Sequence, residues 1–397
     1  MKYLLTLEEK NLVTIQALAY LTSALASPFM TIFLFKNANV QVPLIYKSAT
    51  LIFLLIWYVA SGYLLQKFKS STLIRFGLLN AIVLFSAFVF LKEKAVQYVI
   101  LLGLIDGTVA GNFWAGYNIN QFLLTFKRDR VKYFAAVTRA INILQAAAPA
   151  LGGAIIMYGN RLLGNDGGYG ILFVTAIGLV LVSLPFVSRL PHHKKITFSF
   201  TRMVKRKRTR RWKFILWQNF VLGMYDNAMG VILGILFYVA LQQELYVGVV
   251  MATSYLIGAL GSTMVSRSMR EDDNKYWVGA IGITLATFIF AVSPNVWGAV
   301  IFALVSGITS PFLNIALSTL YFNVVDAEEG TWQDKYHYLI ERDTALGMAR
   351  IISLLVLTMI VTGADEIVKI RVSLLVLSFL PLMLGLFIRK SRVLIQI

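Results

Sequence analysis

Two aspartates lie inside long apolar stretches of the sequence, where a charged side chain is energetically costly. Asp106 falls within the stretch 96–124, and Asp226 falls within 214–240. If these stretches span a membrane, each charge costs about 2.5–3.5 kcal/mol on insertion scales. A carboxylate is costly in its ionised form in such a setting, which suits a group that takes up and releases a proton. We expect both residues to carry a proton or contact a substrate; the alternative is a hydrogen bond between helices.

Polar residues accompany each aspartate at helical spacing. Gln218, Asn219 and Tyr225 share one stripe with Asp226, and such a stripe points into a helix bundle or a wet cavity. We expect the substrate or proton pathway also to include Gln16, Asn112, Trp114, Tyr117, Asn118, Asn142, Gln145 and Asn314. Packing is the alternative for the two aromatic residues, and a structural role is the alternative for the last asparagine.

Two arginines occupy corresponding places near the start of two apolar stretches. Arg139 lies in 134–158 and Arg350 in 345–363. We expect them to form a gate that pairs with carboxylates or helix carbonyls and then parts; snorkelling to water is the alternative. The sequence holds no phosphate-binding loop with its lysine, no Gly-x-Ser-x-Gly elbow and no histidine pair spaced for zinc. We therefore expect no catalytic residue, no metal and no cofactor.

These residues must be positioned by membrane-spanning helices. The 397 residues are 58% hydrophobic and 14% charged, whereas a soluble domain carries about 25% charged residues. Apolar runs of about 20 residues have the length a helix needs to cross a bilayer. Twelve such runs predict an all-α membrane protein with twelve transmembrane helices: 11–35, 44–66, 72–91, 96–124, 134–158, 169–189, 214–240, 245–267, 276–293, 296–322, 345–363 and 367–389.

The positive charge is distributed unevenly between the loops. Lysine and arginine are about fourfold more frequent in the loops on one side, which places both termini and the central loop in the cytoplasm. The basic run 202–213 then accounts for much of the net charge of +18. It is expected to lie against anionic lipid rather than nucleic acid. We expect a multi-pass monomer in the plasma membrane of a bacterium.

The two halves of the sequence are similar at an offset of about 200 residues. Gln16 corresponds to Gln218, Gly62 to Gly261, and Gly107 to Gly307. Gly107 and Gly111 form a small-xxx-small pair that favours close packing of two helices. We expect an N-terminal half at 1–190, a basic cytoplasmic linker at 191–213 and a C-terminal half at 214–397. A second connection, 323–344, is predicted to be a solvated loop.

Twelve spans in two similar halves around a basic loop resemble the major facilitator superfamily. The segment 62–71 is similar to that family's motif between spans 2 and 3 at Gly62, Leu64 and Lys67, but Gln66 stands in place of the family's aspartate. Pro149, Gly152 and Gly153 are similar to an element of span 5 that is typical of antiporter branches. The resemblance implies two pseudo-symmetric six-helix bundles and alternating access. It puts in doubt the cytoplasmic latch that the aspartate supplies.

The sequence therefore predicts a secondary active transporter rather than an enzyme. The two aspartates and their aromatic neighbours favour proton-coupled export of a small amphipathic or cationic compound. Asparagine and glutamine residues suit a sugar, and the two arginines suit an organic anion, so a sugar or organic-anion transporter is the alternative. A membrane-embedded enzyme and a non-transporting receptor are remote alternatives.

Overall fold

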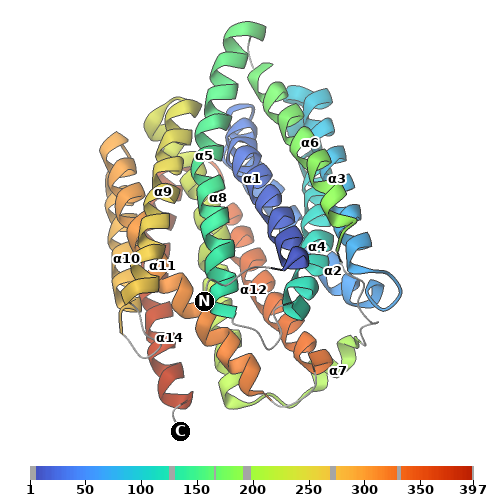
Figure 1. Cartoon of the computed structure of the whole chain (residues 1–397). Coiled ribbons are helices and arrows are strands. Elements are labelled where there is room, and N and C mark those ends of the chain that lie inside the picture. The colour runs from blue at the N-terminus through green and yellow to red at the C-terminus, as the bar shows by residue number, and fades with distance from the viewer. Residues whose placement is uncertain are drawn as a thin grey trace. The chain divides into compact units, whose positions relative to one another are not determined.

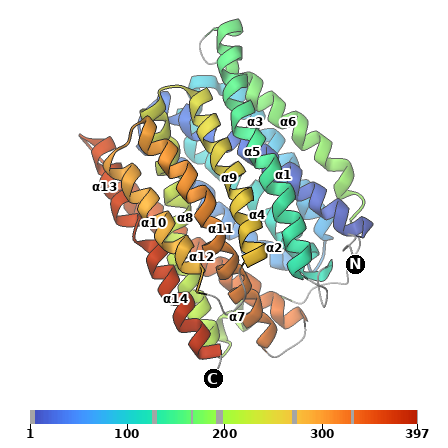
Figure 2. The same ribbon diagram turned by 60° about the vertical axis from the view of Figure 1, so that its left-hand side comes forward.

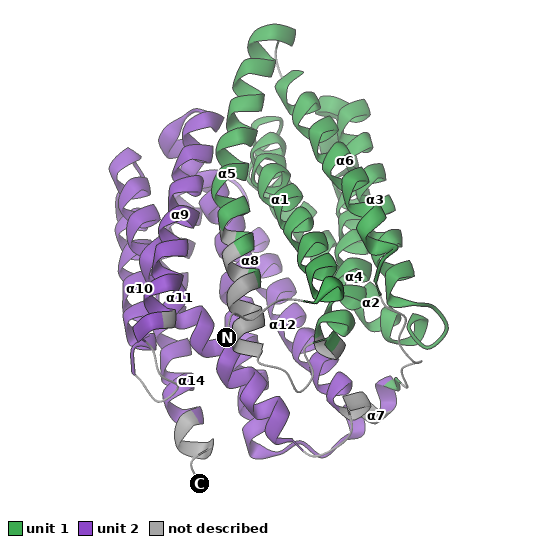
Figure 3. Cartoon of the chain, in the orientation of Figure 1, with its two compact units in different colours: residues 1–199 green, residues 200–397 purple. Residues whose placement is uncertain are grey.

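The computed structural model describes residues 6–124, 130–164, 167–190, 198–268, 274–328 and 332–395. Within these ranges every regular element is helical, in agreement with the predicted all-α class (Figure 1). The chain divides into two compact units, Met1–Ser199 and Phe200–Ile397, and the divide falls inside the predicted linker (Figure 3).

Each unit is a bundle of long helices. Unit 1 contains α1 (Leu7–Lys36), α2 (Gln41–Leu64), α3 (Ser70–Leu91), the short 3-10 helix η1 (Lys92–Tyr98), α4 (Val99–Leu124), α5 (Arg130–Leu163) and α6 (Gly167–Val187). Unit 2 contains α7 (Phe200–Lys205), α8 (Arg210–Leu241), α9 (Glu244–Ser268), α10 (Tyr276–Val292), α11 (Val296–Ala327), α12 (Trp332–Ile360), α13 (Glu366–Leu377) and α14 (Leu380–Ile395).

The helices have the length and composition of membrane spans. Among the described residues, nine helical stretches are long and apolar enough to cross a membrane. One of the nine, Ser70–Gln121, contains α3 and most of α4; α10 is a shorter apolar helix, and α5 is not among the nine. The predicted spans correspond to α1–α6, α8–α12 and the α13–α14 pair, so the twelve-helix plan agrees approximately with the structure.

The two units share one pattern of helix neighbours. In unit 1, α1 packs on α5, while α2 and α3 both pack on α4 (Figures 1 and 2). In unit 2, α8 packs on α12, while α9 and α10 both pack on α11. The glycines Gly107 and Gly307 take corresponding places, because each faces a backbone carbonyl of its neighbouring helix, that of Thr50 or Ser254. The predicted repeat is thus visible in the packing.

Two parts of the predicted organisation are wrong. Gly62 and Gly261 do not correspond, because the first faces the ring of Phe198 and the second faces the backbone of Ile308. The segment 323–344 is not a solvated loop: α11 continues to Ala327 and α12 begins at Trp332. The residues from Tyr336 to Glu341 are buried in α12, which the mixed-charge composition of this segment does not reveal.

Candidate functional site

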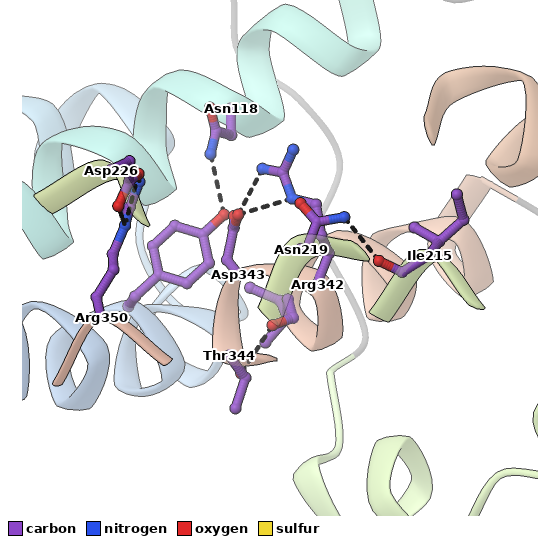
Figure 4. A network of polar contacts seen from close by, with 10 residues as sticks. Asn118, Ile215, Asn219, Asp226, Arg342, Asp343, Thr344 and Arg350 are labelled. Carbon is purple, nitrogen blue, oxygen red and sulfur yellow. Dashed lines mark hydrogen bonds and ion pairs between the residues drawn. The ribbon is translucent and has the colours of Figure 1, made fainter. Parts of the chain in front are cut away.

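An ion pair between Asp226 of α8 and Arg350 of α12 lies among the transmembrane helices of unit 2 (Figure 4). Arg350 Nε lies 3.1 Å from Oδ1 and 3.0 Å from Oδ2 of Asp226, and Nη2 also donates to Oδ2. The adjacent Asn227 donates from Nδ2 to Asp226 Oδ1 at 3.1 Å. Forked arginine–carboxylate contacts of this kind are charge-assisted and directional. Each charge would be costly in a membrane helix without a counter-ion, and the pair supplies a counter-ion to both.

Close packing of α8 against α12 fixes the geometry of this pair. A Cβ at Gly223 would lie 2.9 Å from the Cβ of Ala349, so only glycine allows this approach. One turn further along, Ser353 Oγ donates to the carbonyl of Met224 at 2.8 Å. The side chains of Arg350 and Asp226 remain 23% and 28% exposed. A proton or a small solute can therefore reach a pair whose position is held by the backbone.

Arg350 lies in the second half of α12, not near the start of its helix as the sequence suggested. The shift follows from the early start of α12 at Trp332. The carboxylates that precede Arg350 bind other partners: Asp343 accepts from Arg342, and Glu341 accepts from Arg208 and, at 2.8 Å, from Trp212 Nε1. Asp226 is therefore the carboxylate that Arg350 contacts among the described residues.

A second charged pair lies in unit 1, where α2 and α4 meet. Lys47 Nζ is 3.6 Å from Asp106 Oδ2, and Thr50 Oγ1 donates to the same oxygen at 3.2 Å. Both charged side chains are 20% exposed. Lys47 was not among the candidate residues that the sequence suggested. Its place several residues inside the apolar stretch 44–66 was the signal that could have identified it.

The polar face predicted on α4 exists, but its members bind several different partners. Tyr117 donates to Gln16 of α1 and accepts from Gln121 Nε2 at 3.1 Å. Trp114 packs edge-on against Tyr20, with ring centroids 5.6 Å apart. These contacts link α4 to α1 through buried or half-buried groups.

Two asparagines of α4 have different surroundings. Asn118 Nδ2 donates to the hydroxyl of Tyr58 at 3.0 Å, which ties α4 to α2. Asn112 is fully buried and donates to its own helix at Thr108. Its Oδ1 has no hydrogen-bond partner within the described parts of the chain.

The remaining predicted pathway residues are dispersed. Gln218 and Asn219 are buried in α8, and Asn219 donates to the carbonyl of Ile215 (Figure 4). Tyr225 and Gln145 are half-buried. Asn314 is exposed on α11. Arg139 and Asn142 fall on α5, but their side chains lie outside the described residues, so the gate proposed for Arg139 remains a prediction.

Residues 12–331 match the family model of the Major Facilitator Superfamily. The chain belongs to the major facilitator superfamily. The uncharacterized protein YqgE of Bacillus subtilis (strain 168) is 21% identical over 386 residues, which cover 96% of this chain and 89% of that protein. The predicted resemblance is confirmed.

Solved structures of the superfamily share this fold at low sequence identity. The nucleoside transporter NupG has a TM-score of 0.68 at 13% identity, covering 97% of this chain and 99% of its own. A bacterial homologue of the human drug peptide transporters PepT1 and PepT2 has a TM-score of 0.71 at 10% identity, covering 98% of both chains. The human organic anion transporter MFSD10 (TETRAN) has a TM-score of 0.67 at 12% identity, covering 96% and 98%. The protein is thus a multi-pass membrane transporter of this superfamily.

The superfamily motif between α2 and α3 contacts Phe198, a residue of the predicted linker. Gln66, in the place of the family's aspartate, donates from Nε2 to the carbonyl of Phe198 at 2.6 Å. Gly62 leaves room for the ring of Phe198, which a Cβ would approach to 2.6 Å, and Tyr63 packs edge-on against that ring. Lys67 is exposed. The sequence did not identify Phe198, because the residues around it give no sign that its ring is buried.

The antiporter-like element serves helix packing in unit 1. Pro149 and Gly153 are buried within α5. Gly152 faces α1, where a Cβ would lie 2.6 Å from the ring of Phe29 and 2.9 Å from the carbonyl of Leu25. The element therefore brings α5 close to α1, whatever further role it has.

Proposed function

We propose that this transporter works by alternating access and couples the movement of protons to the export of a small amphipathic or cationic compound. The observation that carries the proposal is the Asp226–Arg350 pair. It places one carboxylate among the transmembrane helices, satisfied by one forked cation and still partly exposed.

The pair provides a physical route to coupling. While Asp226 is ionised, Arg350 neutralises it. A proton on Asp226 removes the charge that holds the guanidinium of Arg350. Alternatively, while Asp226 is ionised, a cationic substrate can take the place of the guanidinium at the carboxylate. Because a proton and a cation compete for one group, binding of either favours release of the other. This competition is what an exchanger of protons for cations requires.

An organic-anion or sugar substrate is the second candidate, and one observation favours it. When Asp226 is protonated, Arg350 presents a planar fork of donors that suits a carboxylate or phosphate. A proton and an anion would then bind together rather than compete. The solved structures of similar fold include a nucleoside transporter, a homologue of drug peptide transporters and an organic anion transporter, but their low sequence identity to this chain supports the fold alone.

Two measurements test the proposal. A thermal-shift screen of the purified protein against cations, sugars, nucleosides and organic anions identifies a ligand that stabilises it. Flux of that ligand is then measured in proteoliposomes under an imposed pH gradient. We expect Asp226→Asn to abolish uphill transport and, for a cationic ligand, to reduce the thermal shift that the ligand produces, because the carboxylate for which proton and cation compete is gone. Asp365→Asn, at an exposed carboxylate before α13, is the matched control. Uphill transport that survives Asp226→Asn would refute the coupling role.

We further propose a monomer in a bacterial plasma membrane with both termini and the linker in the cytoplasm. Some basic side chains of the run 202–213 have partners within unit 2, so we do not propose them as contacts for anionic lipid. Arg206 stacks on Tyr338 at 3.8 Å and Arg208 pairs with Glu341, so both serve unit 2 itself. Among the described side chains of this run, those of Lys205, Lys207, Arg210 and Lys213 are exposed, and we propose that they contact anionic lipid.

A further inference from the structure

The Lys47–Asp106 pair lies at the edge of a tightly packed helix seam. Gly107 of α4 faces the carbonyl of Thr50 and the Cβ of Phe53, which an added Cβ would approach to 2.7 Å. Gly103 and Gly111, one turn away on either side, face α2 in the same manner. Stripes of small residues allow helices in membranes to approach closely. The carboxylate of Asp106 is thus held in register with Lys47, one turn before Thr50 on α2.

Unit 2 contains the same seam without the charges. Gly307 of α11 faces the carbonyl of Ser254 and the Cβ of Ile257 on α9, just as Gly107 faces Thr50 and Phe53. In this register Met251 takes the place of Lys47, and Ser306 takes the place of Asp106. Ser306 is buried and donates to the carbonyl of Phe302 in its own helix.

Helix packing alone does not account for the two charges of the α2–α4 seam. The α9–α11 seam packs with an apolar and a hydroxyl side chain, so the seam itself does not require an ion pair. Placing two charges among membrane helices carries a cost that the packing does not explain. The pair is also loosely made: the ammonium lies beyond hydrogen-bond distance of the carboxylate, and the neutral hydroxyl of Thr50 donates to it.

We propose that Asp106 is a second proton-exchanging carboxylate of this transporter and that Lys47 is its counter-ion. This inference rests on the proposed proton coupling and extends it to unit 1. Protonation of Asp106 frees Lys47 from its charge partner, and deprotonation restores the pair. On protonation Asp106 loses one weak ion pair and keeps an oxygen that can accept from Thr50, whereas Asp226 loses the charge that holds its forked contact with Arg350.

Few other ionisable groups lie on the elements that pack against this part of α4. On α2, Tyr46 is buried beside Asp106. The preceding η1 carries exposed charges at residues 92, 93 and 94. On α3 the one ionisable residue is Arg75, which donates to Ser188.

The charged groups of α1 lie near its two ends. Lys36 lies over the ring of Tyr169 at the end of α1, and residues 8–10 lie in the first turn of α1. Lys47 is therefore the cation in contact with Asp106.

Infrared difference spectroscopy of the lipid-reconstituted protein, titrated with pH, tests this inference without a substrate. A carboxyl group that takes up a proton gains the C=O stretching band of a carboxylic acid. The double variant Lys47→Met with Asp106→Ser copies the seam of unit 2, so we expect it to fold and to lose one such band. Asp106→Asn, which is nearly isosteric, gives the same readout if the double variant is unstable. Lys47→Met alone should retain the band and shift the pH at which it appears.

Asp226→Asn distinguishes the two proposals. It should remove a different carboxyl band and leave that of Asp106 in place. If both Asp106 variants fold and retain every band of the wild-type protein, the inference is wrong while the proposed function stands. If the wild-type protein shows no flux driven by a pH gradient with its identified ligand, the proposed function fails instead. In coupled transport, loss of the Asp106 site should lower the number of protons moved per substrate.

Discussion

Removing both members of the Asp226–Arg350 pair should destabilise the protein no more than removing one of them. A single substitution leaves the remaining charge among transmembrane helices without its counter-ion. Breaking a fully buried pair in this way costs about 3–5 kcal/mol, whereas an exposed pair contributes about 0.2–1 kcal/mol. The two side chains are 23% and 28% exposed, which places this pair between these limits.

We therefore expect Asp226→Asn and Arg350→Met each to lower the free energy of unfolding by about 2 kcal/mol. The double variant should also lose about 2 kcal/mol rather than about 4, because no unpaired charge remains. The resulting coupling energy of about 2 kcal/mol lies within the range measured for residues in direct contact.

Equilibrium unfolding of the four proteins in one mixed-micelle condition measures this cycle. A matched cycle at Asp365 and Lys369, which are exposed or half-exposed near the start of α13, should give a coupling energy below about 0.5 kcal/mol. If the costs of Asp226→Asn and Arg350→Met simply add, the ion pair is not formed in the folded protein. The proton-coupling argument would then lose its geometric basis.

Three further predictions follow from the packing. Gly107→Leu should overpack the α2–α4 seam and lower the free energy of unfolding by about 1–3 kcal/mol or more. Gly178→Leu, with open space around its backbone, should be nearly neutral, and thermal unfolding compares the two variants. Glu341→Gln removes the charge that holds Arg208, so limited trypsin digestion should cut the linker faster, and an unchanged rate would contradict the pairing. Gln66→Ala removes a hydrogen bond worth about 1 kcal/mol, and amide hydrogen exchange just after Phe198 should accelerate.

Much of the helical plan follows from the sequence because each helix must be apolar along its own length to cross a membrane. Run length and hydropathy therefore predict spans without knowledge of the neighbours. The same logic identified Asp226, since a single charge in an apolar run is costly wherever the run packs. Both inferences depend on local composition, which the sequence displays directly.

The partners of these residues could not be predicted in the same way. Asp226 and Arg350 are 124 positions apart, and which helices meet depends on packing. Apolar helices accept many neighbours, so their sequence patterns do not select one. Glu341 illustrates the same limit: a mixed-charge segment predicts a solvated loop, but its carboxylate is buried against Trp212 and Arg208. A charge that has a partner cannot be told from a solvated one by composition.

The charges also depart from the internal repeat that the backbone follows. The pair of unit 2 joins α8 to α12, and the corresponding helices of unit 1 are α1 and α5. In the register set by Gln16 and Gln218, the position of Asp226 corresponds to Ala24, which carries no carboxylate. The pair of unit 1 instead joins α2 to α4. Duplication thus explains the scaffold, whereas each ion pair has to be explained by the function of its own unit.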